Sequence, residues 1–365
     1  MRILIAAGVT GGHIYPGIAI ANEIKRLHPD AVVEFVGIQG CMEERIVPRE
    51  GFGLNYIKSS GFETYSLKLK IKAFFDTFTG VVDGMKIINR FKPDVVVGMG
   101  SFITANMVWA ASLKRVPSVV HEQNEYPGRA IKAVANYTDT IAVSFEDTRR
   151  YFSQKQQKKV VLTGNPVRKE FEAYTREIAR KSLKIGEREK LILCLGGSLG
   201  AKSINLSVIG MARMLKEEKR VKIILISGTA QSEQIMQSAQ AEQLENMTVL
   251  AYSDEMPMLL NAADVVVCRG GATTLFENIM TATPGVYIPY PHAANDHQRK
   301  NIEYITSRGG GVMLDDAQLN AESLYKAVTG IIFDEKRLKA MSENAKGAAP
   351  SDALSRLYNE IEKLL

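Results

Sequence analysis

Short runs of apolar residues alternate along the whole chain with longer segments of mixed apolar and polar residues. The runs before residue 150 are RILIAA, AVVEFVG, DVVVGMG, PSVVHE and TIAVS, and those after it are LILCLGG, VKIILISG, MTVLAY, DVVVCRGG and GVYIPY. Because these runs are apolar at nearly every position, they predict strands buried on both faces of parallel sheets. The segments between them are long enough for helices, so the pattern predicts an α/β fold.

The two halves of the chain repeat one pattern. Each opens with a strand that runs into a glycine turn, at Gly8 and Gly196, and each contains an Asp-Val-Val-Val strand beginning at Asp94 or Asp264. We therefore predict two Rossmann-like domains that face each other across a cleft, the first over residues 1–163 and the second over residues 164–345. Residues 346–365 have the apolar spacing of a helix with one buried face, and this helix is expected to pack back toward the first domain.

Composition agrees with a two-domain protein of the cytosol. A chain of 365 residues with 45% apolar residues exceeds what one hydrophobic core usually organises. The cysteines, Cys41, Cys194 and Cys268, are scattered, which argues against a disulfide framework and a zinc site. The apolar run that precedes Gly8 is too short for a signal peptide.

Two features bear on membranes and polyanions. Residues 95–113 carry no charge, but glycine, serine, threonine and asparagine interrupt them, so they predict a strand, a glycine turn and a helix instead of a membrane span. The net charge is +6, and the whole excess lies in residues 1–165. A basic half can meet nucleic acid or an anionic lipid surface, and it can also be a solvated basic face.

The stretch GVTGGHIYPGIAIA begins at Gly8 and predicts a strand, a glycine turn and a helix from about Pro16. Backbone N–H groups at such a helix start bind phosphate or diphosphate, although the turn can also be only structural. No acidic residue ends the second strand, which disfavours a nicotinamide dinucleotide. His13, at the edge of the turn, could take a proton from an incoming hydroxyl or could simply hold the loop by a hydrogen bond.

The second half offers another anion site at Gly196, Gly197 and Ser198, directly after the strand LILCL. A helix N-terminus and a serine hydroxyl can hold a diphosphate leaving group without a metal. The chain has no Asp-x-Asp sequence, so we expect no metal ion and no cofactor. Arg168 could add a positive charge, and it could also be an ordinary surface residue.

The stretch CRGGATTLFENIMTATPGVYIPYPHAANDHQRKN starts at Cys268. Glu277 falls near the start of the predicted helix, where its carboxylate could accept both hydroxyls of a ribose or could only favour the helix dipole. Gln298 could bind sugar hydroxyls. His292, Asp296 and His297 lack a further ligand at short spacing, so they do not predict a metal site.

The stretch YSLKLKIKAFF alternates lysine with apolar residues before two phenylalanines. Strict alternation suits an edge strand, whereas an extended or helical loop with these residues would suit a bilayer surface. We predict a membrane patch here, made of Lys68, Lys70, Lys72, Phe74 and Phe75.

Together, TGGHIYPGIAIA, KPDVVVGMGS, VPSVVHEQN, GNPVR, GGSLGA, DVVVCRGGATTLFE and DHQRKN resemble, in order, the MurG family of peptidoglycan N-acetylglucosaminyltransferases. The resemblance implies the GT-B fold and inverting transfer of GlcNAc from UDP-GlcNAc to the MurNAc 4-hydroxyl of undecaprenyl-diphospho-MurNAc-pentapeptide. The partners it implies are these two substrates, the anionic cytoplasmic surface of the bacterial membrane and proteins of cell-wall synthesis, and not nucleic acid.

The resemblance also implies roles for single residues. His13 matches the candidate base. Gly11, Gly12, Gly100 and Ser101 match the loops near the acceptor diphosphate. The residues matched to donor binding are Thr10, Gly11, Gly12, Asn124, Arg168, Ser198, Ser253, Ala272, Thr273, Thr274, Leu275, Phe276, Glu277 and Gln298, with Glu277 on the ribose and Gln298 on GlcNAc.

The chain departs from the family pattern at a few positions. Val9 and Ser101 stand where the family usually has glycine, and Ile131 replaces a common asparagine. In the second half Gly270 and Thr273 replace a usual serine and leucine. The first three departures lie in the acceptor half, so a sugar epimerase, a transferase with another lipid acceptor and a non-catalytic UDP-GlcNAc-binding adaptor remain alternatives.

Overall fold

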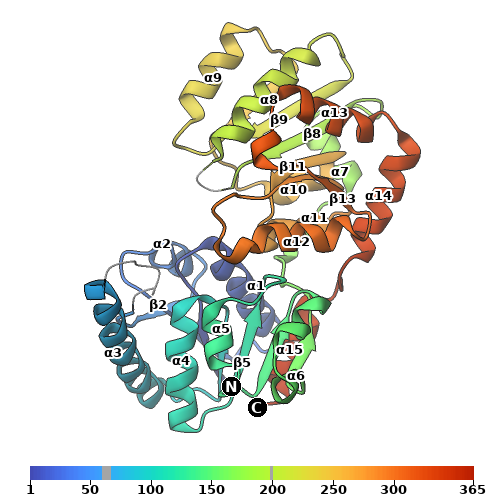
Figure 1. Cartoon of the computed structure of the whole chain (residues 1–365). Helices are drawn as coiled ribbons and strands as arrows, with labels where there is room; N and C mark the ends of the chain where they lie inside the picture. Colours follow the sequence, from blue (N-terminus) through green and yellow to red (C-terminus); the bar gives the residue numbers. More distant parts are fainter. Residues whose placement is uncertain (60–66, 198–199) are drawn as a thin grey trace. The chain divides into compact units, whose positions relative to one another are not determined.

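The computed structural model describes residues 1–59, 67–197 and 200–365, with side chains left undescribed for residues 67–74. The chain forms two compact units. Unit 1 is Met1–Arg168 together with Pro350–Leu365, and unit 2 is Lys169–Ala349. Figure 1 labels many of the helices and strands named below.

Unit 1 is built on a parallel sheet in the order β3-β2-β1-β4-β5-β6-β7. Its strands are β1 (Arg2–Ala6), β2 (Val32–Gly37), β3 (Gly53–Tyr56), β4 (Val95–Gly98), β5 (Ser118–Glu122), β6 (Thr140–Val143) and β7 (Val160–Leu162). The helices are α1 (Gly11–Leu27), α2 (Met42–Arg49), α3 (Leu67–Phe91), α4 (Ser101–Lys114), α5 (Arg129–Val134), α6 (Gln154–Gln157) and α15 (Ala353–Glu362), with a 3-10 helix η1 (Glu146–Tyr151).

Helices cover both faces of this sheet because successive strand residues point to opposite sides. Ile3 and Ile5 of β1 pack with α1 and with α15. Leu4 and Ala6, from the same strand, pack with α3 and α4, which lie side by side. The last helix of the chain thereby completes the core of the first unit.

Unit 2 repeats the plan with the strand order β10-β9-β8-β11-β12-β13. The strands are β8 (Lys190–Leu195), β9 (Val221–Ile226), β10 (Met247–Leu250), β11 (Val265–Arg269), β12 (Gly285–Ile288) and β13 (Gly311–Met313). The helices are α7 (Arg176–Ser182), α8 (Lys202–Met214), α9 (Ser232–Ala241), α10 (Met256–Ala262), α11 (Ala272–Met280), α12 (His297–Thr306), α13 (Ala321–Ile332) and α14 (Glu335–Gly347). Three 3-10 helices complete it: η2 (Lys169–Phe171), η3 (Ala294–Asp296) and η4 (Asp316–Gln318).

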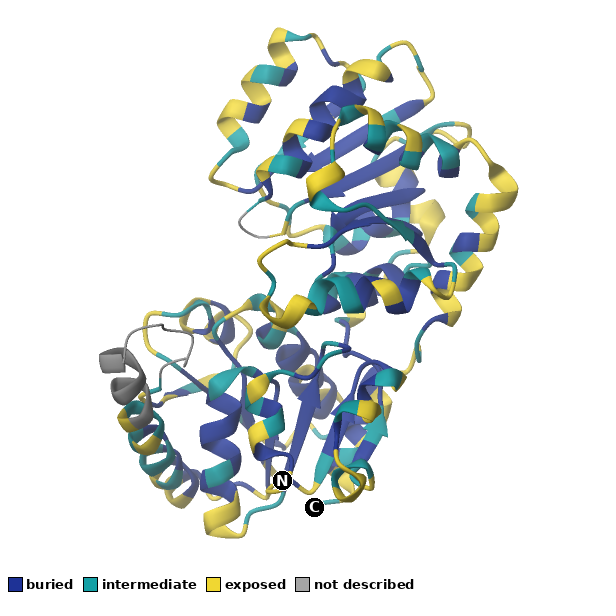
Figure 2. Cartoon of the chain, viewed as in Figure 1, coloured by how far each residue is buried: buried dark blue, intermediate teal, exposed yellow. Residues whose placement is uncertain are grey.

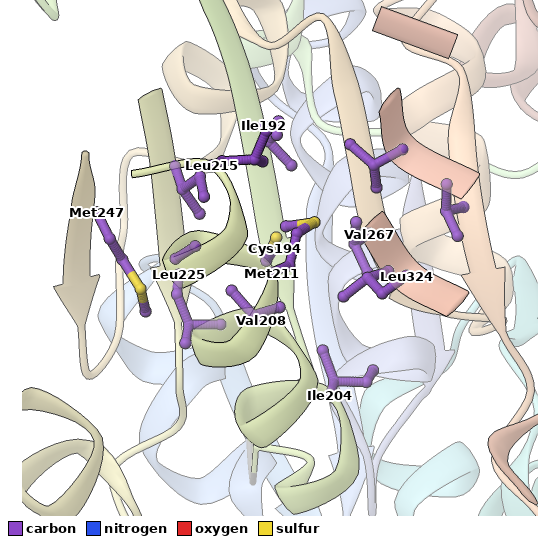
Figure 3. Close-up of a cluster of buried hydrophobic side chains, with 14 of the residues drawn as sticks. Ile192, Cys194, Ile204, Val208, Met211, Leu215, Leu225, Met247, Val267 and Leu324 are labelled. Atoms are coloured by element: carbon purple, nitrogen blue, oxygen red, sulfur yellow. The ribbon is translucent and has the colours of Figure 1, made fainter. Parts of the chain in front are cut away.

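The core of unit 2 lies between its sheet and the helices α8 and α13. Figure 3 shows Ile192 and Val267 of the strands meeting Val208 of α8 and Leu324 of α13. In both units the strands are buried and the helices keep an exposed side (Figure 2). The predicted α/β fold with two Rossmann-like sheets is confirmed.

The sequence repeat at Asp94 and Asp264 has a structural cause. Each aspartate precedes a central strand and accepts a hydrogen bond, 2.7 Å long, from the backbone N–H at or near the start of the first strand of its unit, at Arg2 and Leu191. Asp264 is also buried and paired with Arg176 and Arg180 of α7. The same carboxylate thus fixes the same strand pair in both units.

The local predictions for residues 95–113 and for the first helix have different outcomes. The former form β4 and α4, as the interrupting polar residues predict. The helix predicted from about Pro16 begins at Gly11 instead, because Gly11, Gly12 and His13 already adopt helical backbone after Thr10. His13 therefore lies in the first turn of α1.

The alternation in YSLKLKIKAFF does not produce an edge strand. From Leu67 onward the backbone is helical and continues to Phe91 as α3, so the strand reading of this stretch is wrong. Phe75 and Phe78 are exposed on this helix. The side chains of Lys68, Lys70, Lys72 and Phe74 lie outside the described residues. In the part of the chain that is described, no helix has the length and apolarity to cross a bilayer.

Candidate active site

The sheet topology of each unit marks one place for a ligand. In unit 1 the order reverses between β1 and β4, and in unit 2 it reverses between β8 and β11. In open parallel sheets, ligands bind outside the carboxyl ends of the strands at such a switch point, because the following loops leave to opposite faces there. A glycine-containing turn follows each of these four strands, at Gly8, Gly100, Gly196 and Gly270.

In unit 1 the turn between β1 and α1 is held in place by hydrogen bonds to Glu43 of α2. This carboxylate is fully buried and accepts hydrogen bonds from the backbone N–H groups of Val9 and Ile38, both 2.9 Å long. A Cβ atom at Gly8 would lie 2.4 Å from Glu43 Oε1, so only glycine leaves room for the carboxylate. The role of Glu43 is not visible in the sequence, since a Met-Glu-Glu helix start carries no signal of a loop anchor.

His13 lies between this turn and the start of α4. Its Nδ1 is 3.0 Å from Thr10 Oγ1, so one ring nitrogen is paired with a neighbouring hydroxyl. Its other edge lies over Gly100, where an added Cβ would be 2.5 Å from His13 Cδ2 and 2.8 Å from Nε2. Gly100 also has a φ of +89°, so both space and backbone require glycine there. The structure thus brings together the predicted residues Thr10, His13 and Gly100.

The carboxyl end of β5 adds a buried polar cluster beside His13. His121 is fully buried, and burial lowers the pKa of its imidazole to about 4, with the neighbouring His13 adding to the effect. Its Nε2 pairs with the Gly164 carbonyl oxygen at 2.9 Å, and its Nδ1 pairs with Gln123 Nε2 at 3.1 Å. His121 is therefore a neutral structural group and not a second base.

Asn124, the predicted sugar contact, is oriented by Glu122. One oxygen of this buried carboxylate accepts from Asn124 N at 2.9 Å and from Asn124 Nδ2 at 3.2 Å. The other accepts from the backbone N–H of Gly128 at 2.8 Å. Burial raises the pKa of the Glu122 carboxyl, and these hydrogen bonds counteract that rise. Of the residues in HEQN, only Asn124 was predicted to have a role in the site.

Val9 and Ser101, the departures from glycine, occupy left-handed backbone. Their φ angles are +73° and +65°, in a region where a side chain is strained. Ser101 Oγ is buried without a hydrogen-bond partner among the described residues, at the first turn of α4. Ile131, the other departure in this unit, is buried in the core beside α4 and does not reach the site.

In unit 2 the turn after β8 is as crowded as its counterpart. A Cβ at Gly196 would lie 2.3 Å from Ala201 N, and one at Gly200 would lie 2.2 Å from the Ser227 carbonyl oxygen. Gly200 also has a φ of +78°. The turn leads into α8, whose N-terminus can receive an anion. Ser198, the predicted diphosphate contact, lies outside the described residues.

The turn between β11 and α11 is held by α12. Gln298 Oε1 accepts from the backbone N–H of Gly270 at 3.1 Å and of Tyr290 at 3.0 Å. Buried Asn301 donates to the Gly270 carbonyl oxygen at 3.1 Å. With its oxygen engaged twice, the Gln298 side chain has its Nε2 hydrogens to offer to a sugar hydroxyl.

The predicted donor residues of α11 divide by exposure. Thr273, Thr274 and Glu277 are partly exposed, whereas Leu275 and Phe276 are buried in the core. The latter two thus support the first turn of the helix and do not expose side chains to a ligand. Ala272 is the first residue of the helix and is buried too.

Two other predicted donor residues belong to other parts of the chain. Ser253 follows the edge strand β10, which lies two strands from β8 on the side away from β11, and its Oγ accepts from the backbone N–H of Glu255 at 3.1 Å. Arg168 ends the first segment of unit 1, with its guanidinium 5.1 Å from the ring centre of Tyr15 on α1. The histidines near α12 do not form a metal cluster, and no group of three or more metal-ligating side chains gathers among the described residues.

Comparison with known proteins defines the class. The model of the glycosyltransferase family 28 N-terminal domain matches residues 3–143, and that of the C-terminal domain matches residues 191–357. The fold resembles the crystal structure of Acinetobacter baumannii MurG, with a TM-score of 0.78, 23% identity and 99% of each chain covered. It also resembles UDP-GlcNAc 2-epimerase from Neisseria meningitidis, with a TM-score of 0.67, 14% identity and 100% of each chain covered.

Curated relatives match over the full chain. The UDP-N-acetylglucosamine--N-acetylmuramyl-(pentapeptide) pyrophosphoryl-undecaprenol N-acetylglucosamine transferase of Caldanaerobacter subterraneus is 35% identical, with 100% of both sequences covered. The enzymes of that name from Acetivibrio thermocellus and Clostridioides difficile are 35% and 34% identical over 100% of this chain, covering 98% and 89% of their own lengths.

The fold and the two family models define a glycosyltransferase of family 28 with the GT-B fold. Within that class, the chain belongs to the MurG family of UDP-N-acetylglucosamine-dependent N-acetylglucosaminyltransferases. The epimerase shares the fold, but the chain is only 14% identical to it, whereas it is 34–35% identical to the transferases over its full length.

Proposed function

We propose that the chain transfers N-acetylglucosamine from UDP-GlcNAc to the 4-hydroxyl of MurNAc in undecaprenyl-diphospho-MurNAc-pentapeptide, with inversion at C1. The observation that carries the proposal is the turn at the β1–β4 switch point, where His13 lies over Gly100 between two helix N-termini. An imidazole beside two anion-binding helix starts suits a base next to a lipid-linked diphosphate.

The acceptor diphosphate is assigned to Gly11 and Gly12 on α1 and to Gly100 and Ser101 on α4. The N-termini of both helices follow adjacent strands, and the macrodipole of each favours an anion by about 0.3 to 1 kcal/mol. The buried hydroxyl of Ser101 supports the assignment, because it has no hydrogen-bond partner among the described residues. An oxygen of the acceptor diphosphate would accept its proton.

In the transfer step, the acceptor hydroxyl oxygen forms the new bond to C1 of GlcNAc as the bond from C1 to the diphosphate oxygen breaks. The hydroxyl proton passes to His13. Because Nδ1 is paired with Thr10, Nε2 is the nitrogen that takes it. UDP leaves with the bonding electrons, and its charge is met by the N-terminus of α8 and by Arg168.

Donor binding is assigned to unit 2 and to Asn124. The partly exposed Glu277 would accept the ribose hydroxyls, and Gln298 would donate to GlcNAc through Nε2. Thr273 and Thr274, in the first turn of α11, would contact the diphosphate together with Arg168. The backbone of Ser253 would contact uracil. Glu122 supports this assignment, since its Oε1 accepts hydrogen bonds from both the backbone N–H and the side-chain Nδ2 of Asn124.

The start of α3 is assigned to the cytoplasmic membrane surface. At about 100° per residue, positions 67, 71, 74, 75 and 78 of this helix share one face, and these positions are all apolar. Positions 68, 70 and 72, all lysine, flank that face. An apolar stripe between cations is the pattern of a helix that lies in the headgroup region of an anionic bilayer.

The test incubates the purified chain with radiolabelled UDP-GlcNAc and a short-chain lipid-linked MurNAc-pentapeptide, and follows label in lipid and release of UDP. Label in the lipid that depends on the acceptor is the expected result. Isomerised sugar without labelled lipid would identify an epimerase, and tight UDP-GlcNAc binding without turnover would identify an adaptor. Either result would overturn the proposal.

His13 is tested in the same assay. His13→Gln is expected to lower kcat by about 100- to 10,000-fold, the range for a general base, with a small change in the KM for UDP-GlcNAc. Turnover near that of the wild type at saturating substrates would remove His13 from the base role and leave it a loop residue bonded to Thr10.

A further inference from the structure

Two consecutive aspartates follow β13 and bind different parts of unit 2. Asp315 pairs with Arg299 in the first turn of α12. Asp316, the first residue of η4, pairs with Arg269 at the end of β11 at 2.6 Å and accepts from Ser203 Oγ in the first turn of α8 at 2.8 Å. The two carboxylates thus connect η4 to the start of α8, the end of β11 and the start of α12.

Arg269 joins the start of α8 to the loop between β12 and α12. Its Nη2 donates to Ser203 Oγ at 3.1 Å, and its Nη1 donates to Asp316 and to the backbone carbonyl oxygen of Pro289 at 3.2 Å. The side chains of Arg269, Ser203 and Asp316 therefore form a closed triangle of hydrogen bonds. Arg269 is only 13% exposed, so Asp316 supplies the counter-charge that its guanidinium needs.

Asp315 supports a loop whose backbone is strained. Asn295 and Asp296 have φ angles of +53° and +54°, in the left-handed region that disfavours side chains. Arg299 pairs with Asp296 at 3.2 Å and with Asp315, so its guanidinium ties this loop to the residue before η4. Strained backbone persists where its surroundings over-determine it. Gln298, assigned to GlcNAc, lies directly before Arg299 in the same turn.

We propose that Asp315 and Asp316 are positioning residues that serve different parts of the sugar nucleotide. Asp316 fixes the start of α8, assigned to the diphosphate, and Asp315 fixes the turn of Gln298, assigned to GlcNAc. The inference rests on the proposed function. Neither carboxylate touches the donor, because a carboxylate facing the diphosphate would repel it. Each acts through the side chains that it binds.

The two pairs differ in exposure, which separates positioning from support of the fold. Asp315 and Arg299 are 42% and 34% exposed, and an ion pair this exposed contributes little to stability. A loss of sugar affinity on changing Asp315 would therefore not come from unfolding. Asp316 is 22% exposed and its partner Arg269 is more buried, so we expect changes at Asp316 to lower stability as well.

Titration calorimetry with UDP and with UDP-GlcNAc separates the two roles. Asp315→Asn should weaken UDP-GlcNAc binding by about 3- to 10-fold and leave UDP binding within about twofold, because UDP has no sugar for Gln298 to bind. Asp316→Asn should weaken both ligands by a similar factor, because both contain the diphosphate. In the transfer assay, both variants should raise the KM for UDP-GlcNAc and leave the acceptor KM unchanged.

Glu322→Gln is the matched control. Glu322 forms an exposed ion pair with Lys326 on α13, so its loss should change neither affinity. Equal weakening of UDP and UDP-GlcNAc by Asp315→Asn, or no weakening of either, would overturn the proposal. The link through Arg299 is tested by a double-mutant cycle, in which Asp315→Asn should have little further effect on UDP-GlcNAc binding in an Arg299→Met background. Additive losses would contradict that link.

Ser203→Ala keeps both charges of the triangle and replaces Asp316→Asn if that variant does not fold. It should weaken UDP and UDP-GlcNAc alike, and unchanged UDP affinity would overturn the role of Asp316. These titrations need no acceptor. A chain that shows the expected affinities and makes no lipid product would therefore overturn the proposed transfer and not this inference. A chain that transfers sugar while its affinities ignore positions 315 and 316 would do the reverse.

Discussion

Ser101 combines a strained backbone with an unsatisfied hydroxyl at the N-terminus of α4. Left-handed backbone costs a residue with a side chain about 1 to 2 kcal/mol, whereas glycine adopts it freely but loses more entropy on folding. The buried hydroxyl adds a further cost that vanishes when a ligand accepts its proton. Under the proposed function, position 101 exchanges stability for a contact with the acceptor diphosphate, as functional sites often do.

We expect Ser101→Gly to raise the free energy of unfolding by about 1 kcal/mol and to raise the KM for the lipid-linked acceptor. Urea unfolding and steady-state kinetics on one preparation check both effects. A variant that is more stable with the same acceptor KM would show that the hydroxyl is not a ligand contact, and a less stable variant would contradict the argument from strain.

His121 is expected to make folding sensitive to acid. Its pKa is lowered to about 4 in the folded chain from an ordinary value of 6.5, so the unfolded chain binds the proton more tightly. The stability is complete above about pH 6.5 and is lost as the pH falls toward 4, by roughly 3 kcal/mol in all. Glu122 acts in the opposite sense, because burial raises the pKa of its carboxyl.

The measurement compares urea unfolding of the wild type and His121→Gln between pH 4 and 7. Subtracting the variant curve removes the contribution of Glu122, which both proteins share. The difference should fall with decreasing pH. A difference that does not change across this range would mean that His121 is not held neutral.

At the level of single residues, the sequence predicts the groups to which we assign ligand contacts and misses the groups that hold their loops in place. Thr10, His13 and Gln298 stand in motifs whose residue types suggest phosphate, proton or sugar chemistry. Glu43 and Asp315 lie elsewhere in the chain from the residues they support, and only the sheet order brings β2 beside β1 and β13 beside β12. A single sequence contains no signal for that proximity.

At the level of elements, α2 anchors the turn between β1 and α1 through one carboxylate. Each oxygen of Glu43 accepts one backbone N–H, from Val9 and from Ile38. A glutamine would present an NH2 group to one of these donors and lose that hydrogen bond. The turn between β1 and α1 would then lose one of the contacts that set its position.

Glu43→Gln is therefore expected to lower the free energy of unfolding by about 1 to 3 kcal/mol and to raise the acceptor KM, with the UDP-GlcNAc KM nearly unchanged. Glu44→Gln is the matched control. This neighbour on the same helix is exposed and accepts from the Gly40 N–H, so its loss should change stability by about 0.5 kcal/mol or less. Equal effects of the two substitutions would contradict the anchoring role.

The elements themselves were largely predictable. Buried parallel strands are apolar throughout, so their period is plain in the sequence, and the repeated Asp-Val-Val-Val strand predicts the repeated sheet. The start of α1 and the helical state of residues 67–91 could not be predicted from the sequence. Glycines give no helical signal in the first turn of α1, and lysine at every second position imitates a strand although the backbone continues as a helix.

At the level of the whole molecule, unit 1 is completed by the end of the chain. Leu357 and Ile361 of α15 are fully buried in the core formed by β1 and α1. Leu324 of α13 has the same exposure in the core of unit 2. Truncating either leucine to alanine removes the same group from one unit only, at a cost of about 2 to 5 kcal/mol.

Leu357→Ala should therefore lower the thermal transition of unit 1, and Leu324→Ala that of unit 2, which assigns each transition in a calorimetric scan. UDP is assigned mainly to unit 2, so it should raise the temperature of the transition that Leu324→Ala lowers. At a hundred times its Kd, UDP should add about 2.7 kcal/mol to the free energy of unfolding of that unit. The transition lowered by Leu357→Ala should rise less, through the contribution of Arg168 alone. If UDP raised only the transition assigned to unit 1, the assignment of the nucleotide to the switch point between β8 and β11 would be wrong, because a ligand stabilises the unit whose folded form it binds.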